Sequence, residues 1–335
     1  MARRRVTIGD VAAQAGVSIA TVSKVINGRY GVSAATLERV QAVIDQLGYQ
    51  SSIVAQSLRS HRTNVIGILV ADIEPFSAEL LKGAARAIRG TGYELVVYSA
   101  SGRGEKQAGW ERRYLSRVSG TLTDGTILVT PTVVEVEHDA PVVAVDPHTG
   151  PSNLPTVASD NLRGAMTATE YLIGLGHRRI GFLAGRPDLE SARLREQGYR
   201  QALANAGIPV DPELIRVGGY QRETAAEPAR ELLRRADPPT AVFAANDLTA
   251  IETMEAAASL GLSVPDDVSV IGFDNVPESA LTDPGLTTIE QPIQRMGAEA
   301  VRLLVGLIEQ TWSGPLQLTL PTALVVRQSC RAVHP

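Results

Sequence analysis

The chain has 335 residues, of which 44% are hydrophobic and 20% charged, so it is long enough for two or three globular domains of ordinary composition. Its formal net charge of −4 is unevenly spread: residues 1–62 hold eight Lys and Arg against three Asp and Glu, a surplus of +5, and the remainder carries −9. The single Cys330 excludes an intramolecular disulfide. No apolar run approaches the roughly 18 residues of a membrane span, and no signal peptide follows the N-terminal arginines. We therefore expect a cytoplasmic protein.

Residues 7–27, TIGDVAAQAGVSIATVSKVIN, predict two short helices joined by a tight turn. Thr7 caps the first helix in a capping box with Asp10. Gly16 supplies the turn because glycine adopts left-handed angles at little cost. Ser18 caps the second helix. This pattern predicts a helix-turn-helix, whose second helix enters the DNA major groove with its N-terminal residues on the base edges.

A third helix is expected at 34–47, with Ser33 as its cap and Gly48 at its end. Apolar residues recur at helical spacing on one of its faces, namely Leu37, Val40, Val43, Ile44 and Leu47. A helix pair alone fits plain structural packing equally well. The third helix and the basic surplus together favour a DNA-binding module.

From residue 65 onwards, continuous apolar runs alternate with helical segments. Strands are expected at 65–71, 94–100, 125–130, 140–146, 179–185, 214–219, 241–246 and 268–274. Helices are expected at about 77–90, 105–118, 161–175, 191–206, 223–235, 247–260 and 293–310. This alternation predicts parallel sheets with helices on both faces, and two such series predict two doubly wound α/β subdomains.

Polar side chains follow several of these strands, where ligands bind in folds of this class. Asp146, Asn246 and Asp274 each end a strand, and Tyr220 follows the strand at 214–219. Carboxylates and amides bind vicinal hydroxyls, and an aromatic ring packs on the apolar face of a sugar. We therefore expect a cleft for a small polyhydroxylated ligand. A helix cap also fits Asn246 and Asp274, plain packing also fits Tyr220, and a cap is the favoured role of Asp247.

The sequence contains no motif of an enzyme or a metal site. It has no G-x-x-x-x-G-K-[ST] phosphate loop and no G-x-S-x-G nucleophile elbow. The pair Gly102 and Gly104 lacks the third glycine of a dinucleotide fingerprint, and the five histidines show no metal-ligand spacing. We predict a protein that is not an enzyme and holds no cofactor or metal.

Along essentially its whole length the chain resembles the LacI/GalR family of bacterial transcription regulators. The motifs that carry the resemblance are VTIGDVAAQAGVSIATVSKVIN at 6–27, LGYQSSIVAQSLRS at 47–60, IGILVADIEPFSAELLKGA at 66–84, LGHRRIGFLAG at 175–185, SARLREQGY at 191–199, AVFAANDLTAIETM at 241–254, VPDDVSVIGFDN at 264–275 and LTTIEQP at 286–292. Their order and spacing together are highly specific.

The resemblance implies a helix-turn-helix domain at 1–50, a hinge at 51–62 and an effector-binding and dimerisation domain at 63–335. The last would have a periplasmic-binding-protein-like architecture. Its two subdomains would occupy about 63–158 with 291–318, and about 161–288 with 320–331, joined by crossings near 157–161, 286–292 and 316–322.

In the head, the resemblance implies base contacts by Ile19, Ala20 and Lys24. Phosphate contacts are expected from Thr7, Ser18, Thr21, Ser23 and Asn27. A core position also fits Ile19.

The hinge is shorter than the ~12–15 residues that hold a helix alone in water, so we expect it to need DNA and a second copy for support. The resemblance implies that Leu58 wedges into the minor groove, with Val54 and Ala55 at the contact between the two hinges. An apolar linker residue is the alternative for Leu58.

In the cleft, Arg195, the second arginine of SARLR, matches the main effector-binding arginine of the family. The other implied effector contacts are Phe76, Ser77, Asp146, Ser191, Tyr220, Asn246 and Asp274. Asp146 stands where recognition of a base would favour an aromatic residue, which favours a sugar.

These features predict a homodimeric repressor of carbohydrate-utilisation genes, released from a palindromic operator by a mono- or oligosaccharide. No heptad helix follows VVRQSCR, so we expect no tetramer. One alternative is a co-repressor-dependent regulator, whose purine-type ligand tightens DNA binding. The other is a solute-binding protein, which the DNA-binding head disfavours.

Overall fold

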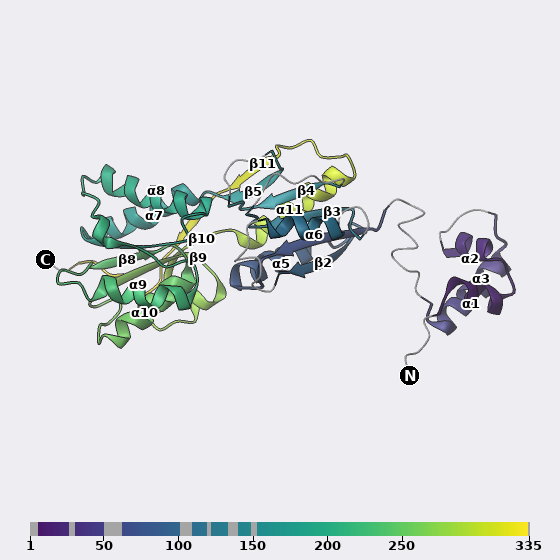
Figure 1. Ribbon diagram of the computed structural model, residues 1–335, viewed down its shortest axis with the longest axis horizontal. Helices are drawn as coiled ribbons and strands as arrows, with labels where there is room; N and C mark the ends of the chain where they lie inside the picture. Colours follow the sequence, from purple (N-terminus) through teal and green to yellow (C-terminus); the bar gives the residue numbers. More distant parts are fainter. Residues whose placement is uncertain are drawn as a thin grey trace. The chain divides into compact units, whose positions relative to one another are not determined.

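The computed structural model of the chain describes residues 6–26, 31–49, 62–100, 109–118, 122–132, 140–148 and 153–333. The chain divides into two compact units, Met1–Thr63 and Asn64–Pro335 (Figure 1). Among the described residues, no helix combines the length and the apolar character that a membrane span requires.

The first unit contains the three predicted helices, α1 (Ile8–Ala15), α2 (Ile19–Ile26) and α3 (Ala34–Leu47). They enclose a small core formed by Val11, Ala12, Ala15, Val22, Val25, Val40 and Val43. With so small a core, the fold of this unit also depends on the chain entering and leaving each helix at a defined residue.

The predicted helix caps are confirmed. The Thr7 hydroxyl accepts the backbone N–H of Asp10 at 3.3 Å, and the Asp10 carboxylate accepts the N–H of Thr7 at 2.8 Å, which completes the capping box. The Ser18 hydroxyl accepts the N–H of Thr21 at 3.1 Å. Gly16 ends α1 in the left-handed region, at φ 65°. These caps fix the turn that separates α1 from α2.

The apolar face predicted for α3 is wrong at its first position. Leu37 is 46% exposed, whereas Val40 and Val43 are buried. The contact of α3 with the other two helices is centred on these two valines, and Leu37 lies one turn before it. Helical spacing gives the direction of a side chain but not how far the neighbouring helices extend.

The second unit contains two sheets, as predicted, and each of them has six strands. The first sheet has the order β11-β5-β4-β3-β1-β2, all parallel. Its strands are β1 (Val65–Val70), β2 (Glu94–Ser99), β3 (Gly125–Val129), β4 (Val142–Val145), β5 (Thr156–Ser159) and β11 (Gln317–Leu320). The helices around it, which complete the first subdomain, are α5 (Pro75–Ala87), α6 (Trp110–Val118) and α11 (Ile293–Ile308).

The second sheet has the order β12-β10-β9-β8-β6-β7, in which only the β10–β12 pair is antiparallel among the strands described. Its strands are β6 (Ile180–Ala184), β7 (Ile215–Val217), β8 (Ala241–Ala244), β9 (Ser269–Asp274), β10 (Thr287–Glu290) and β12 (Ala323–Val325). The second subdomain also contains α7 (Asn161–Gly174), α8 (Glu190–Asn205), α9 (Arg222–Leu233), α10 (Asp247–Ser259) and the 3-10 turns η1 (Pro212–Leu214) and η2 (Pro277–Ala280).

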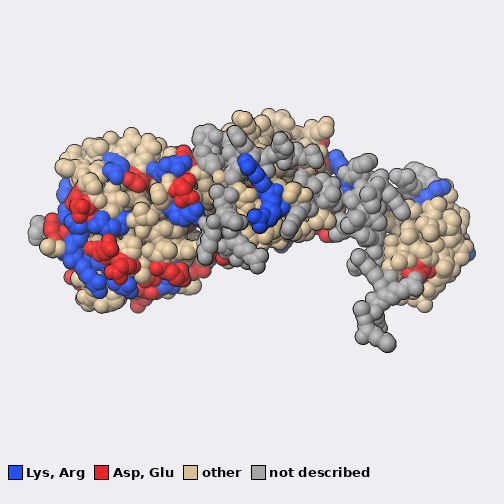
Figure 2. All heavy atoms as spheres, viewed as in Figure 1, with Lys and Arg blue, Asp and Glu red and all other residues tan. Residues whose placement is uncertain are grey.

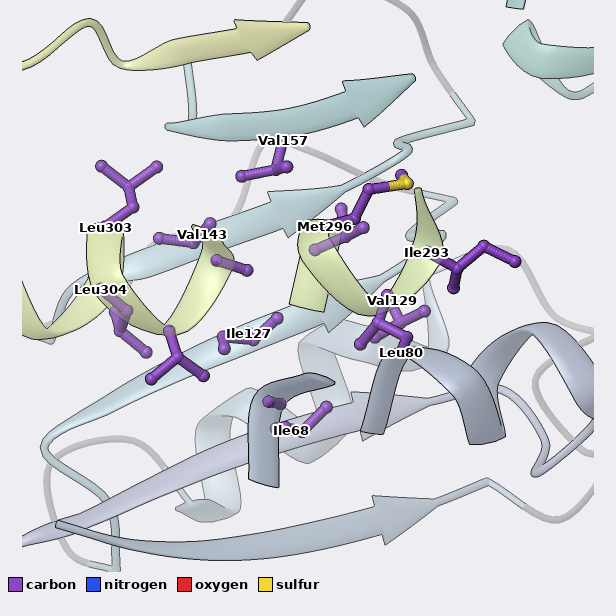
Figure 3. Packing of buried hydrophobic residues seen from close by; sticks show 14 of the residues in the cluster. Ile68, Leu80, Ile127, Val129, Val143, Val157, Ile293, Met296, Leu303 and Leu304 are labelled. Atoms are coloured by element: carbon purple, nitrogen blue, oxygen red, sulfur yellow. The ribbon is translucent and has the colours of Figure 1, made fainter. Parts of the chain in front are cut away.

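Successive residues of each central strand point to opposite faces, which buries both faces of each sheet. In the first subdomain, Ile68 packs with the cluster around α5 and α11, whereas Leu69 packs with the cluster around α6. Figure 3 shows Leu80 and Met296 of the covering helices packed among the sheet residues Ile68, Ile127, Val129 and Val143. The continuous apolar strands of the sequence are explained by this burial on both sides.

The chain passes between the subdomains three times. It leaves β5 for α7 at Asp160, leaves β10 for α11 at Gln291 and Pro292, and leaves β11 for β12 at Pro321 and Thr322. The strands next to these crossings are β5, β10, β11 and β12. β5 and β11 belong to the first sheet, and β10 and β12 belong to the second.

Four of these strands, β5, β10, β11 and β12, are not among the strands expected from the sequence, and the first three overlap the segments expected as crossings. The strands β5, β10 and β11 have four residues each and the interrupted sequences TVAS, TTIE and QLTL, whereas β12 is apolar but has only the three residues ALV. Their pairing is set by where the sheets end in space.

Two glycines bring α5 and α11 into close contact. A Cβ atom on Gly297 would clash with the carbonyl oxygen of Leu80, and one on Gly83 would clash with that of Gln294. We expect Gly297→Ala to lower the free energy of unfolding by at least about 1–3 kcal/mol, because the opposing atoms are backbone and cannot rotate away.

Gly174→Ala is the matched control, because this helical glycine has no atom within 4 Å of its would-be Cβ. It should stay within about 1 kcal/mol of the wild type or be slightly more stable. Urea unfolding of the two variants measures the difference, and equal midpoints would contradict the close helix contact.

Candidate functional site

A cavity of about 460 Å³ lies between the two subdomains, beyond the carboxyl ends of their strands. Both subdomains contribute to its lining. The structure brings all eight predicted effector residues to it: Phe76, Ser77, Asp146, Ser191, Arg195, Tyr220, Asn246 and Asp274. Their contact with an effector stays a prediction, but sequence positions almost 200 residues apart do line one cavity.

Arg195 is the centre of this cavity. Its Nε donates to Oδ1 of Asn161 at 2.8 Å, and its Nη1 donates to the carbonyl oxygen of Ala245 at 2.5 Å and to Asp274 at 3.4 Å. The guanidinium carbon lies 3.9 Å from the ring centroid of Phe273. Among the described residues, Nη2 of Arg195 has no hydrogen bond. The guanidinium group is therefore held through Nε and Nη1, and its Nη2 can donate to a ligand.

Two buried carboxylates flank this arginine. Asp146, on the first subdomain, accepts from Nδ2 of Asn161 at 3.1 Å, and Asp274, on the second, accepts from Nε2 of Gln291 at 2.6 Å. Burial raises the pKa of Asp274 to about 7, although Arg195 and Gln291 act in the opposite direction. Burial also raises the pKa of Asp146, against the charge of Arg195. The cavity therefore holds carboxylates that are not fully compensated by the protein.

Three of the eight residues have backbone angles that side chains rarely adopt. The φ angles are 47° at Asp146, 71° at Tyr220 and 117° at Asp274. Such a residue costs on the order of 1–3 kcal/mol and persists where the surroundings hold it. All three lie at the ends of strands that open onto the cavity, so strain is concentrated at this site.

Asn246 caps a helix and also lies in the lining of the cavity, while its contact with a ligand stays a prediction. Its Oδ1 accepts the N–H of Thr249 at 3.0 Å, which caps α10, and its side chain also lines the cavity. Its Nδ2 donates to the carbonyl oxygen of Tyr220 at 3.0 Å, which fixes that strained residue.

The cap role predicted for Asp247 is wrong. Its carboxylate accepts from the N–H of Val276 at 2.9 Å and from the hydroxyl of Thr288 at 2.5 Å. Because Asn246 occupies the cap position, Asp247 falls in the first turn of α10 and instead ties that helix to the neighbouring strand ends.

Tyr220 and Ser191 form part of the second-subdomain wall. The two hydroxyls lie 3.3 Å apart, and burial raises the pKa of Tyr220. The tyrosine ring lies where a Cβ atom on Gly185 would be, so any other residue there would displace it. The absence of a side chain at Gly185 therefore determines where the aromatic surface lies.

Phe76 and Ser77 lie at the start of α5 in the first subdomain, beside Glu74. Glu74 caps α5: it accepts the N–H groups of Phe76 at 3.2 Å and Ser77 at 3.1 Å, and the Ser77 hydroxyl at 2.9 Å. Desolvation in the cleft raises the pKa of Glu74, although the residue as a whole is exposed and the hydrogen bonds from Ser77 lower its pKa. Glu74 also lines the cavity and is not among the effector residues predicted from the sequence.

Other lining or supporting residues escaped sequence reasoning. Asn161 and Gln291 orient Arg195 and Asp274, and Trp110, Thr132 and His148 line the first-subdomain wall. Asn161 and Gln291 lie in segments that the sequence analysis expects as crossings. A polar residue at a crossing is therefore a sequence feature that could have identified them as site residues. No sequence pattern marked Trp110, Thr132 or His148.

In the first unit, α2 presents the predicted DNA-contacting side chains on its exposed side. Ile19 is 51% exposed, and Ala20 and Lys24 are exposed as well, so the core position considered for Ile19 is excluded. Thr7 and Ser18 are exposed, whereas Thr21 and Ser23 are half-buried. Asn27, Val54, Ala55 and Leu58 lie outside the described residues, as do Arg3, Arg4, Arg5, Arg29 and Arg59, which carry most of the basic surplus.

The second subdomain has a different surface. Figure 2 shows its basic and acidic side chains interspersed on the face in view. They form ion pairs such as Arg222–Glu252 at 3.4 Å and Arg216–Glu231 at 3.1 Å. A surface of mixed charge lacks the single-sign patch that binds DNA.

Comparison with known proteins gives a consistent result for both units. Residues 7–52 match the bacterial regulatory proteins of the lacI family, and residues 169–330 match a periplasmic binding protein-like domain. The HTH-type transcriptional repressor PurR of Photobacterium profundum is 35% identical, over 98% of this chain and 99% of that protein.

Two solved structures are similar over almost their full length. The complex of the transcriptional regulator CelR with cellobiose is 34% identical with a TM-score of 0.73, and the match covers 97% of this chain and 100% of that one. The lac repressor dimer bound to operator and the anti-inducer ONPF is 28% identical with a TM-score of 0.84, over 98% and 100% of the two chains.

The raised pKa of Asp274 predicts a pH-dependent contribution to stability. Its ordinary value is 3.8 and its value in the folded protein is about 7. Between these values the folded state binds more protons than the unfolded state, so this residue lowers the free energy of unfolding as the pH rises towards 7.

Asp274→Asn removes this contribution. The variant should gain stability relative to the wild type as the pH is raised from 5 to 7, and the difference should level off above 7. Urea unfolding of both proteins at several pH values measures it. Parallel curves across this range would show that Asp274 titrates normally.

Proposed function

The chain belongs to the LacI family of bacterial regulatory proteins, and we propose that it is a homodimeric repressor that leaves a palindromic operator when a small neutral sugar binds in the cleft. As a member of this family it is a DNA-binding transcription regulator. The proposal concerns the ligand, the direction of its effect and the assembly. The protein acts in the cytoplasm, where the DNA is.

The arrangement of polar groups around Arg195 is the single observation that supports a sugar as the ligand. A buried guanidinium with free donors lies between carboxylates on opposite walls, Asp146 and Asp274. Vicinal hydroxyls can donate to the carboxylates and accept from the arginine at the same time. The ring of Tyr220 is available to the apolar face of the sugar.

The charge of the lining favours a neutral ligand. Four carboxylates line the cavity, at Asp72, Glu74, Asp146 and Asp274, against the two arginines Arg186 and Arg195. A phosphorylated or acidic sugar would place further negative charge among them, which is costly in a site withdrawn from water. The similarity to the CelR–cellobiose complex supports an uncharged sugar as well.

On the DNA side, the exposed Ile19, Ala20 and Lys24 of α2 support base contacts in the major groove. Two copies would each read one half-site, which requires a palindromic operator. The similarity to the operator-bound lac repressor dimer supports this assembly. The hinge contacts of Val54, Ala55 and Leu58 stay predictions from the sequence.

The proposal is tested by fluorescence anisotropy with DNA from upstream of the protein's own gene, at fixed salt, against a panel of neutral sugars and purines. Release by one sugar is the expected result. Tightening by a purine would contradict the sugar proposal and establish a co-repressor.

Two variants separate the two sites. Arg195→Lys keeps the charge between the carboxylates but loses the planar fork. We expect it to bind the operator normally and to need at least about tenfold more sugar for release. Ile19→Ala should do the opposite: it weakens operator binding and leaves sugar affinity unchanged. An unaltered sugar response of Arg195→Lys would place the effector elsewhere.

A further inference from the structure

The cavity is lined by a second group of residues on the first subdomain besides those around Arg195, namely Trp110, Thr132 and His148. Hydrogen bonds connect the segments that carry these residues. The N–H of His148 donates to the carbonyl oxygen of Pro131 at 3.0 Å, and the N–H of Gly109 donates to the Thr132 hydroxyl at 3.1 Å. The three side chains therefore come from segments that are bonded to one another.

Glu111 holds this group together. Its side chain is fully buried, and its Oε1 accepts from the N–H of Thr132 at 2.5 Å and from the Thr132 hydroxyl at 2.9 Å. This joins the start of α6 to the loop after β3. Trp110, the residue before Glu111, is 5% exposed and packs with the apolar cluster around α6, where Tyr114 lies edge-on against it at 5.6 Å between ring centroids, and it also lines the cavity.

His148 lacks a partner that a buried polar group normally has. Its Nδ1 is buried, and no described residue hydrogen-bonds to it. Burial lowers the pKa of His148 to about 4, so the ring is neutral at pH 7. A neutral imidazole can bond to a hydroxyl as donor or acceptor. The carbonyl oxygen of His148 accepts the N–H of Glu190 at 2.9 Å, so this residue lies where the two walls meet.

The size of the cavity is greater than one sugar ring requires. At about 460 Å³ it has roughly three times the volume of the ~150 Å³ cavity that accommodates a benzene ring. A single pyranose ring at Arg195 would leave a large part of it to water. The lining also includes Trp110 and the unpartnered imidazole of His148, both on the first subdomain.

We propose that Trp110 and His148 form an outer subsite for the second ring of a neutral disaccharide, while Arg195, Asp146 and Asp274 bind the first ring. The apolar face of the second ring packs on Trp110, and one of its hydroxyls bonds to His148. Glu111 is a positioning residue that acts through Thr132. This inference rests on the proposed function and specifies the length of its ligand.

Trp110 allows a direct test because Trp312 is the only other tryptophan of the chain. In the full-length Trp312→Phe variant, fluorescence reports on Trp110 alone. The titrants are cellobiose, maltose and lactose, with glucose and galactose as the corresponding monosaccharides. We expect one disaccharide to change the emission and to bind at least about tenfold more tightly than its monosaccharides.

Calorimetry on position 110 then separates the two rings. Trp110→Ala should weaken disaccharide binding about tenfold and alter monosaccharide binding less than about twofold, while Trp110→Phe restores most of the loss. His148→Ala should have the same selective effect, and it is the second variant if Trp110→Ala does not fold.

Glu111 is tested through the tryptophan that it positions. In the Trp312→Phe background, Glu111→Ala should shift the Trp110 emission to longer wavelength and weaken only disaccharide binding. A purely structural role would lower stability without this selectivity.

Each other outcome has a defined meaning. Equal affinities for a disaccharide and its monosaccharides, or an unchanged preference in both Trp110→Ala and His148→Ala, would overturn the outer subsite and leave the sugar-responsive repressor intact. No binding of any sugar would overturn both proposals.

Discussion

The buried guanidinium of Arg195 is the constraint on which the cleft depends. A charge withdrawn from water must be paired and hydrogen-bonded, and removing a partner from such a group costs about 3–5 kcal/mol. Asn161, Ala245 and Asp274 meet that requirement on one side of the fork. Because Asn161 also bonds to Asp146, the same network extends from the second subdomain to the first. One buried side chain therefore links polar groups on both walls.

Without a ligand, the residues around Arg195 carry two energetic costs, backbone strain and buried carboxylates. The backbone is strained at Asp146, Tyr220 and Asp274, and burial raises the pKa values of both aspartates. Sites with such features lie at the low end of local stability and respond to what binds them. A sugar that supplies hydroxyls to these groups would stabilise one arrangement of the subdomains over another. It can control DNA binding only to the extent that it binds those arrangements with different affinity.

Much of this structure is predictable from sequence because its determinants are local. Periodicity and caps fix the helices of the first unit, and continuous apolar runs fix the central strands. The short strands β5, β10, β11 and β12 are not predictable in this way, since they exist only where a sheet edge is available. The same limit explains Leu37, whose exposure depends on the reach of neighbouring helices. In the cleft, the residues that end strands were predictable, whereas Trp110, Glu111 and His148 come together only through the fold.

The central claim is that the cleft and the head are thermodynamically coupled, and the most direct test is reciprocity. The affinity for the sugar is measured without DNA and with saturating operator, and the affinity for the operator is measured without and with saturating sugar. The account predicts that both affinities fall by the same factor, because one coupling free energy governs both. A sugar that binds equally well in the absence and presence of operator would contradict it.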